Sequence, residues 1–174
     1  NIAPDDVIAA PDAKSIYDIP LNFEKDHFGE NILKKFGLKA KVKDGNLAWR
    51  KFVDDIKNPK DTIEVGIVGK YFASGDFCFT DSYVSVIEAI RHAGAKNHTK
   101  VNLHWLSAED VSEKSAATFK KLDGLIIPQG WGSRGSEGKI EAIKYCREKK
   151  VPYLGLCYGM QMAVVEYSRN VLGL

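Results

Sequence analysis

The chain has 174 residues, of which 44% are hydrophobic, and its formal net charge is +2. This length accommodates one domain of ordinary size with an appendage, and so small a charge argues against a nucleic-acid-binding surface. No run of about 18 apolar residues occurs, so no membrane-spanning helix is expected.

The first part of the chain, up to about residue 60, is expected to be irregular with short helices. Apolar residues recur at helical spacing in residues 30–38 and 47–57. Residues 10–23 contain two prolines and show little periodicity, so they are expected to be irregular. The sequence NPKD at 58–61 indicates a turn or linker before the main domain.

From Thr62 onward, strand patterns alternate with helix patterns. Strands are expected at 62–71, 100–107, 122–130 and 151–157, and helices at 81–94, 135–150 and 158–173, with a partly helical segment at 108–121. This alternation predicts an α/β fold, with a mostly parallel sheet that carries helices on both faces.

Two of these helices carry more specific expectations. Asp81 or Ser82 can cap the helix at 81–94, and Gly94 is expected to end it. The helix at 158–173 is expected to bury Met160, Ala163, Val164 and Tyr167.

Three glycine-bearing loops follow predicted strands, at 69–77, 128–135 and 155–159. In parallel sheets ligands bind beyond the carboxyl ends of the strands. We therefore expect these loops to converge on one site.

Cys157 occupies the sharpest of these turns, in the pattern G-x-C-x-G between Gly155 and Gly159. A turn from strand to helix holds a thiol out of the sheet, the helix dipole favours the thiolate, and the next N–H can stabilise an oxyanion. The alternative is a small apolar residue at a helix start, between glycines placed for packing. The pattern alone leaves both interpretations open.

The loop PQGWGSRG at 128–135 could supply a second oxyanion donor beside the N–H of Tyr158. It could equally be an ordinary connection between a strand and a helix. Arg134 and Glu137 could form a solvated pair at a helix start, and Gln161 could bind a polar substrate or point into water.

The remaining cysteines and histidines indicate no disulfide framework and no metal site. The three cysteines are odd in number and widely spaced, which favours a reducing, cytoplasmic compartment. Cys146, on a helix with apolar neighbours, is expected to be structural. The four histidines form no HxH or HExxH pattern.

GLCYGMQ at 155–161 resembles the nucleophile motif of class I glutamine amidotransferases, commonly G-[IL]-C-x-G-[MH]-Q. Several further segments together resemble the CTP synthase family, whose loop usually reads PGGFGxRGxEGK: SIYDIP, VGKY, DSYVSVIEAIRHAG, PQGWGSRGSEGKI and VPYLGLCYGMQMAVVEYSRNV. The resemblance covers essentially the whole chain in collinear order.

The resemblance implies a class I glutamine amidotransferase fold, which is flavodoxin-like. Residues 1–42 would be the tail of a synthetase (amidoligase) domain, 43–61 an interdomain linker helix, and 62–174 the N-terminal part of an incomplete glutaminase domain. The family is a cytoplasmic ligase of pyrimidine biosynthesis, a homotetramer that makes CTP from UTP, ATP and L-glutamine. ATP and Mg2+ act in the synthetase domain, and GTP activates glutamine hydrolysis.

By the same resemblance, Cys157 is the nucleophile that forms a γ-glutamyl thioester. The backbone N–H groups of Gln129 and Tyr158 take the oxyanion-hole positions. The remaining matches are glutamine-binding positions at Gly130, Trp131 and Gln161, lid positions linked to GTP at Arg134, Gly135 and Glu137, and ATP-binding positions at Asp12 and Ala13. No cofactor, metal, nucleic-acid or membrane site is expected within this chain itself.

Three departures from the family pattern bear on activity. Gln129 replaces the first glycine of the PGG motif, and a positive φ at this position would strain glutamine by about 1 kcal/mol or more. The loop at 69–83 is longer than the shortest family versions, which could change the pocket rim. The family's catalytic His and Glu lie beyond Leu174, so this chain is expected to be a fragment with little or no turnover alone.

Two rival functions remain at this point. One is another cysteine hydrolase of the same architecture, such as a γ-glutamyl hydrolase-like peptidase, and the synthetase-like tail argues against it. The other is a pseudo-glutaminase that only binds partners, which Gln129 and the missing triad residues would favour.

Overall fold

The computed structural model describes residues 2–42, 45–70, 73–74, 77–78, 80–112 and 115–174. It separates into two compact units, Asn1–Asn58 and Pro59–Leu174. The division falls within the segment 43–61 that was expected to link two domains.

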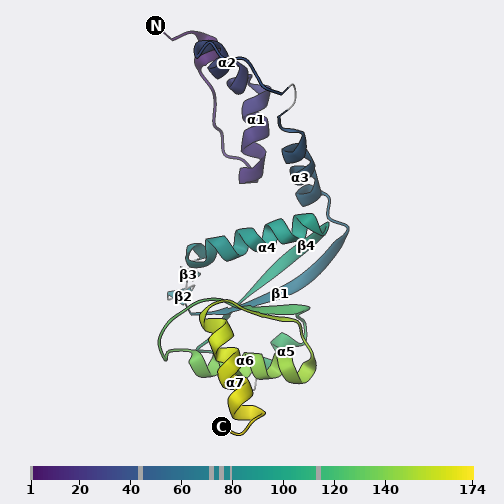
Figure 1. Ribbon diagram of the computed structural model, residues 1–174, viewed down its shortest axis with the longest axis vertical. Coiled ribbons are helices and arrows are strands. Elements are labelled where there is room, and N and C mark those ends of the chain that lie inside the picture. The colour runs from purple at the N-terminus through teal and green to yellow at the C-terminus, as the bar shows by residue number, and fades with distance from the viewer. Residues whose placement is uncertain (1, 43–44, 71–72, 75–76, 79, 113–114) are drawn as a thin grey trace. The chain divides into compact units, whose positions relative to one another are not determined.

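The first unit consists of short helices (Figure 1), and the rings of Tyr17, Trp49 and Phe52 lie close together in it. Its elements are η1 (Pro4–Asp6), η2 (Ile16–Asp18), α1 (Ile19–Lys25), α2 (Phe28–Lys35) and α3 (Leu47–Lys57). The ring of Tyr17, which is buried, lies 6.0 Å from that of Trp49 and 5.4 Å from that of Phe52. Trp49 Nε1 also donates a hydrogen bond to the Tyr17 carbonyl at 2.9 Å.

The expectation that residues 10–23 are irregular is wrong for their second half, because α1 begins at Ile19. Pro20 lies in the first turn of α1, where the missing N–H of proline has no intrahelical partner to lose. A proline in the sequence was therefore compatible with a helix start as well as with a loop.

The second unit has the predicted α/β architecture. Its elements are β1 (Asp61–Gly69), β2 (Ala73–Ser74), β3 (Phe77–Cys78), η3 (Thr80–Tyr83), α4 (Val84–Lys96), β4 (Thr99–Ser107), α5 (Ala116–Phe119), β5 (Gly124–Ile127), α6 (Ser136–Lys149), β6 (Tyr153–Gly155) and α7 (Tyr158–Asn170). Four of its described strands form a parallel sheet in the order β4-β1-β5-β6. The described parts of the loop at 69–83 include a small antiparallel ladder of β2 with β3.

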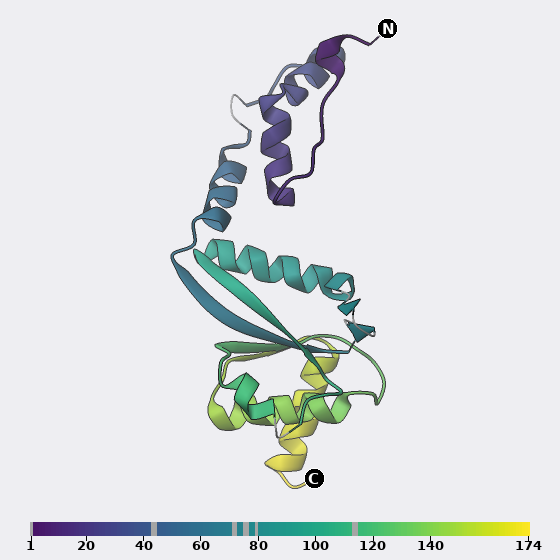
Figure 2. The same ribbon diagram turned by 180° about the vertical axis from the view of Figure 1, so that it is seen from behind.

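Helices cover both faces of this sheet, as expected. Figures 1 and 2 show α4 on one face and α5, α6 and α7 on the other. Strand β1 is buried on both sides: Ile67 packs with Tyr83 and Val86 toward α4, and Val68 joins the larger core beneath α6 and α7. A strand buried on both faces requires the near-continuous apolar run that β1 has.

The strand order reverses at β1, and this reversal positions the candidate site. The chain moves from β1 to β4 on one side and then crosses back to β5 on the other side of β1. Right-handed crossovers in opposite directions place their helices on opposite faces, so the loops after β1 and β5 diverge and leave a crevice at their carboxyl ends.

The expected boundaries of α4 are wrong at both ends. The helix proper begins at Val84 after the 3-10 turn η3, and its N-cap position is Tyr83, with no capping side-chain hydrogen bond. Gly94 is buried inside α4, and a Cβ there would lie 2.7 Å from the Thr99 carbonyl oxygen. Gly94 is therefore needed for close packing against the start of β4 rather than for ending the helix.

The buried face of α7 also differs from the expectation. Met160, Val164 and Tyr167 have exposed fractions of 53%, 62% and 50%, whereas Met162 and Glu166 are buried. Arg147 of α6 accounts for the burial of the charged residue, since its guanidinium binds the Glu166 carboxylate through three hydrogen bonds of 2.8–3.1 Å. The hydrogen bonds from Arg147 hold the pKa of the Glu166 carboxyl below its usual range.

We predict that Arg147→Met lowers the free energy of unfolding by about 3 kcal/mol, because it leaves the buried Glu166 carboxylate without its charged partner and with only the Asn170 amide as a donor. The double variant Arg147→Met/Glu166→Met should recover most of this loss. Because the folded-state pKa of Glu166 is lowered, the contribution of the pair is present at neutral pH and is lost as the pH falls through that pKa. Urea unfolding followed by circular dichroism measures the effect.

Arg91→Met is the matched control, because it removes an exposed pair with Glu88 and should cost less than about 1 kcal/mol. Equal losses in Arg147→Met and Arg91→Met would contradict the prediction.

Candidate active site

Cys157 lies at the tip of a strained turn between β6 and α7. Its backbone has φ 53° and ψ −105°, outside the regions that residues with side chains normally occupy. Such a conformation costs on the order of 1–3 kcal/mol and persists only where the surroundings enforce it. The thiol is exposed, as a nucleophile at a strand-to-helix turn should be.

The two glycines around Cys157 are required by close contacts, as the sequence pattern predicted. A Cβ at Gly159 would lie 1.9 Å from the Ile127 carbonyl oxygen, and one at Gly155 would lie 2.6 Å from the Met160 amide nitrogen. The start of α7 therefore lies directly against the end of β5. Glycine at both positions is what allows the turn to form.

The loop after β5 and the cysteine turn meet through the side chain of Tyr158. The Tyr158 and Ser136 hydroxyl oxygens lie 2.7 Å apart, and the Ser136 hydroxyl also donates to the Gly132 carbonyl at 3.1 Å. Tyr158 is the first residue of α7, and N–H groups of the first helical turn have no acceptor within the helix. Its amide is therefore in the right place to serve as an oxyanion donor.

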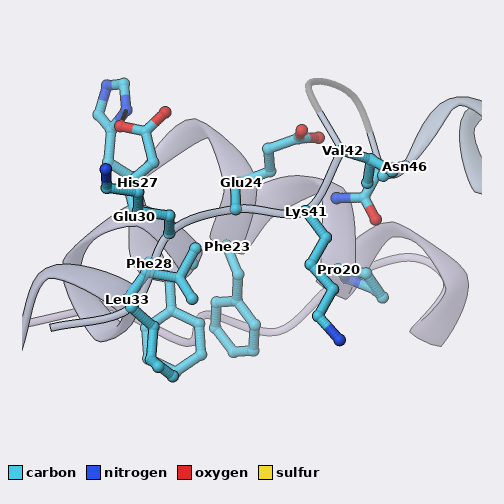
Figure 3. A pocket seen from close by; sticks show the side chains of 15 residues that line it. Pro20, Phe23, Glu24, His27, Phe28, Glu30, Leu33, Lys41, Val42 and Asn46 are labelled. Carbon is cyan, nitrogen blue, oxygen red and sulfur yellow. Dashed lines mark hydrogen bonds and ion pairs between the residues drawn. The ribbon is translucent and has the colours of Figure 1, made fainter. Parts of the chain in front are cut away.

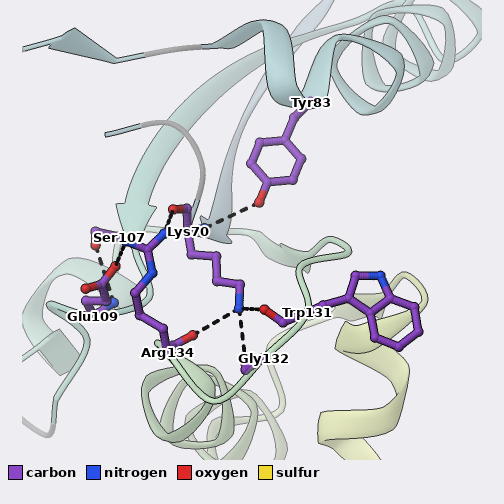
Figure 4. Close-up of polar contacts among 7 residues, drawn as sticks. All are labelled: Lys70, Tyr83, Ser107, Glu109, Trp131, Gly132 and Arg134. Atoms are coloured by element: carbon purple, nitrogen blue, oxygen red, sulfur yellow. Dashed lines mark hydrogen bonds and ion pairs between the residues drawn. The ribbon is translucent and has the colours of Figure 1, made fainter. Parts of the chain in front are cut away.

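Lys70, which follows β1, connects the loop after β1 to the loop after β5 (Figure 4). Its side chain is buried, and Nζ donates to the carbonyls of Trp131, Gly132 and Arg134, at 3.1 and 3.3 Å for the last two. The three glycine-bearing loops thus converge, as their positions after strands predicted. Residues 71–72, 75–76 and 79 lie outside the described residues.

Gln129 is not strained, contrary to the concern raised by its replacement of glycine. The described non-glycine residues with positive φ are His27, His98, Lys150 and Cys157. The Tyr83 hydroxyl donates to the Gln129 carbonyl at 3.3 Å, and Gln129 is one of the residues that line an apolar groove of about 640 Å³ between α4 and the sheet.

Lys139 lies fully buried beneath both loops of the candidate oxyanion hole. Its Nζ donates to the Pro128 carbonyl at 3.3 Å and lies 5.1 Å from the centre of the Tyr158 ring. Burial, and to a lesser extent nearby Lys70, lower the pKa of Lys139 to about 8, while Cys157 opposes the shift.

The expected lid residues are held by partners outside the loop. Arg134 donates to the Lys70 carbonyl at 3.1 Å and pairs with Glu109 at 3.3 Å. Glu137, in the first turn of α6, pairs with Arg169 of α7 at 3.1 Å. Gly135 has φ 70° before α6, so glycine is favoured there.

The expected glutamine-binding positions lie around the same turn. Gly130 is buried, and a Cβ there would lie 3.2 Å from both Lys139 Nζ and Lys70 Cε. Trp131 is 71% exposed on the loop, and Gln161 is exposed one turn into α7. A substrate lying over Cys157 would therefore meet side chains that are free of core packing.

The expected ATP-binding residues, Asp12 and Ala13, belong to the first unit. They lie between η1 and η2 and do not line the pocket of about 760 Å³ in that unit. Figure 3 shows this pocket, with Phe23, Phe28 and Leu33 on one side and Lys41 on another. The assignment of Asp12 and Ala13 to ATP remains a prediction.

Lys70, Tyr83 and Lys139 were not expected at the candidate site from the sequence. One signal was available for each lysine: Lys70 comes directly after an apolar strand, and Lys139 lies on the apolar face of its helix with Ile143 and Cys146. Tyr83 carried no signal, since its aromatic ring fits a helix start as well as a hydrogen-bonded core position.

Cys146 is a structural thiol, as expected. It is buried in the core beneath α6 and α7, and burial raises its pKa to about 12. Within the described ranges no helix is long and apolar enough to span a membrane, and no group of three or more His, Cys, Asp or Glu side chains could hold a metal ion.

A model of the family "glutamine amidotransferase class-I" matches residues 78–173, which include Cys157 and the whole loop after β5. The chain belongs to the class I glutamine amidotransferase family. The match lies entirely within the second unit.

Both units of this amidotransferase are similar in sequence to CTP synthases. It is 46% identical to the CTP synthase of Methanocaldococcus jannaschii over 97% of this chain and 31% of that protein. It is 45% identical to the CTP synthase of Caldanaerobacter subterraneus subsp. tengcongensis over 100% of this chain and 32% of that protein. The chain thus spans about a third of the length of these relatives.

A solved structure gives the same result for the fold of this amidotransferase. The glutaminase domain of Trypanosoma brucei CTP synthase, with bound acivicin, matches with a TM-score of 0.57 and 30% identity. The match covers 64% of this chain and 42% of that chain.

We predict that Gly159→Ala lowers the free energy of unfolding by about 3 kcal/mol or more, because its Cβ would overlap the Ile127 carbonyl oxygen. Gly29→Ala, on α2 with nothing within 4 Å, is the matched control and should stabilise by about 0.5–1 kcal/mol. Thermal unfolding of both variants measures the difference. A Gly159→Ala variant as stable as the parent would show that α7 does not lie against β5 as described.

Proposed function

We propose that this chain is a piece of a CTP synthase that carries the N-terminal part of its glutaminase domain, in which Cys157 releases ammonia from L-glutamine. The family's catalytic His and Glu are not among its residues, so the piece alone is proposed to have little or no turnover. The observation that carries the proposal is the strained turn at Cys157, whose cost is otherwise without purpose. The similarity of both units to CTP synthases favours this protein over other cysteine hydrolases of the fold.

In the proposed reaction, the Cys157 thiolate attacks the side-chain carbonyl carbon of glutamine and forms a tetrahedral oxyanion. The N–H groups of Gln129 and Tyr158 stabilise that oxyanion. The C–N bond then breaks as the general base, a histidine that the resemblance places beyond residue 174, returns the proton it took from the Cys157 thiol to the leaving nitrogen, so that ammonia leaves and a γ-glutamyl thioester remains on Cys157. Water hydrolyses the thioester to glutamate and restores the thiol.

Neighbouring residues would bind the substrate and control access to it. Gly130, Trp131 and Gln161 are assigned to glutamine, and Arg134, Gly135 and Glu137 to a lid linked to activation by GTP. The ion pairs of Arg134 with Glu109 and of Glu137 with Arg169 are exposed, so each is worth about 1 kcal/mol or less. Pairs of this strength can break and form again as a lid moves.

The parent enzyme is proposed to be a cytoplasmic ligase and homotetramer that uses the ammonia to aminate UTP to CTP, with ATP and Mg2+. The described residues do not provide a metal site, so no step involving Mg2+ is assigned to them. Asp12 and Ala13 are the positions of this chain proposed to lie near ATP.

The glutamine-analogue electrophile 6-diazo-5-oxo-L-norleucine should label the full-length protein once, at Cys157, with protection by glutamine. The buried thiol of Cys146 is a control within the same chain and should remain unlabelled. Intact mass and peptide mapping locate the adduct, and Cys157→Ala should abolish it.

A folded protein that forms no adduct at Cys157 would overturn the active glutaminase proposal. It would favour a pseudo-glutaminase that only binds partners. Labelling by the analogue without ammonia release from glutamine would instead favour a different cysteine hydrolase.

A further inference from the structure

The ammonium group of Lys139 contacts both backbone segments that would form the oxyanion hole. Nζ lies 3.3 Å from the Pro128 carbonyl oxygen on one side and 5.1 Å from the Tyr158 ring centre on the other. The side chain is fully buried although the family mechanism, as outlined above, gives it no role. Burying an ammonium group is costly, so its retention here calls for an explanation.

The contact with Pro128 fixes the direction of the Gln129 amide. A trans peptide is planar, so its C=O and the following N–H point in opposite directions, and the described chain has no cis peptide bond. A hydrogen bond that holds the Pro128 carbonyl toward Lys139 therefore turns the Gln129 N–H away from Lys139. Tyr83 holds the next peptide in the same way, through the Gln129 carbonyl at 3.3 Å.

The contact with Tyr158 bears on the second donor. A cation within about 6 Å of an aromatic ring centre is attracted to the ring, and Lys70 Nζ also lies 5.8 Å from the same centre. With its hydroxyl at Ser136 and its ring beside two cations, the Tyr158 side chain is restrained at both ends. Its amide begins α7 next to Cys157, so this restraint also limits movement of the turn.

The same geometry explains why glycine follows Gln129. Gly130 has φ 155°, a backbone conformation that favours glycine, and a Cβ there would also lie a tight 3.2 Å from Lys139 Nζ and from Lys70 Cε. Gln129, in contrast, has no positive φ and is exposed beside the groove next to α4, so a larger residue is accommodated there.

We propose that Lys139 is a positioning residue of the oxyanion hole, whose buried ammonium holds the Pro128–Gln129 peptide and the Tyr158 ring and so sets both N–H donors. The inference rests on the proposed glutaminase function. It predicts that removing Lys139 lowers the rate of the chemical step rather than the affinity for glutamine, because an oxyanion exists only after attack on the substrate.

The test measures kcat and KM for glutamine hydrolysis by the full-length protein. Lys139→Met removes the donor and the charge and should lower kcat about tenfold or more, with KM changed less than about threefold. Lys139→Gln keeps a donor for Pro128 and should lose less. Lys149→Met, which removes an exposed lysine of the same helix, is the matched control and should keep the parental kcat.

A pH profile separates positioning from a purely structural role. The titratable groups that face Lys139 are Lys70 after β1 and Cys157 and Tyr158 at the start of α7. Because the pKa of Lys139 is lowered to about 8, its ammonium loses the proton as the pH rises through that value. The parent should therefore show a fall in kcat above about pH 8 that Lys139→Gln lacks.

Failure of the two proposals gives different results. A parental protein that neither hydrolyses glutamine nor reacts at Cys157 overturns the proposed function and the inference with it. An active parent with Lys139→Met and Lys139→Gln within twofold of its kcat overturns the inference alone. If Lys139→Met does not fold, the test uses Lys139→Gln and the parent alone. Identical pH profiles of kcat for these two proteins would then overturn the inference.

Discussion

The close approach of α7 to the end of β5 is the contact on which the candidate site depends. Gly159 lies so near the Ile127 carbonyl that no side chain fits between them, and this forces the chain at Cys157 into a conformation that side chains rarely adopt. The same approach turns Met162 and Glu166 into the core. The buried Glu166 carboxylate is paired with Arg147 of α6. The turn at Cys157 therefore also bears on the contact between α6 and α7.

Two buried lysines stabilise the other half of the site. The loop after β5 is glycine-rich and has little core packing of its own, yet its carbonyls are held by Lys70 and Lys139 at four positions from Pro128 to Arg134. Ammonium groups suit this task, because one can donate to several carbonyls that diverge from a turn. The cost is electrostatic, since the two cations lie close enough for Lys70 to lower the pKa of Lys139.

The architecture explains how a departure from the family motif is tolerated. Position 129 has no positive φ that would require glycine, and Gln129 is exposed there. The glycine that remains, Gly130, has φ 155°, and a Cβ there would crowd the side chains of Lys70 and Lys139. Substitution is therefore permitted at one position of the pair and opposed at the next, although both were glycine in the expected motif.

The alternation of strands and helices, the strand-to-helix turn at Cys157 and the convergence of three loops could be predicted from the amino-acid sequence, because these depend on local periodicity and on glycine spacing. The position of Gly94 inside α4, the burial of Met162 and Glu166 rather than Met160 and Val164, and the place of Lys70, Tyr83 and Lys139 at the site became visible in the folded chain alone. Their partners are 11 to 64 residues away along the chain. The physical reason is that burial of a charge or a glycine is set by what packs against it, which local pattern does not specify.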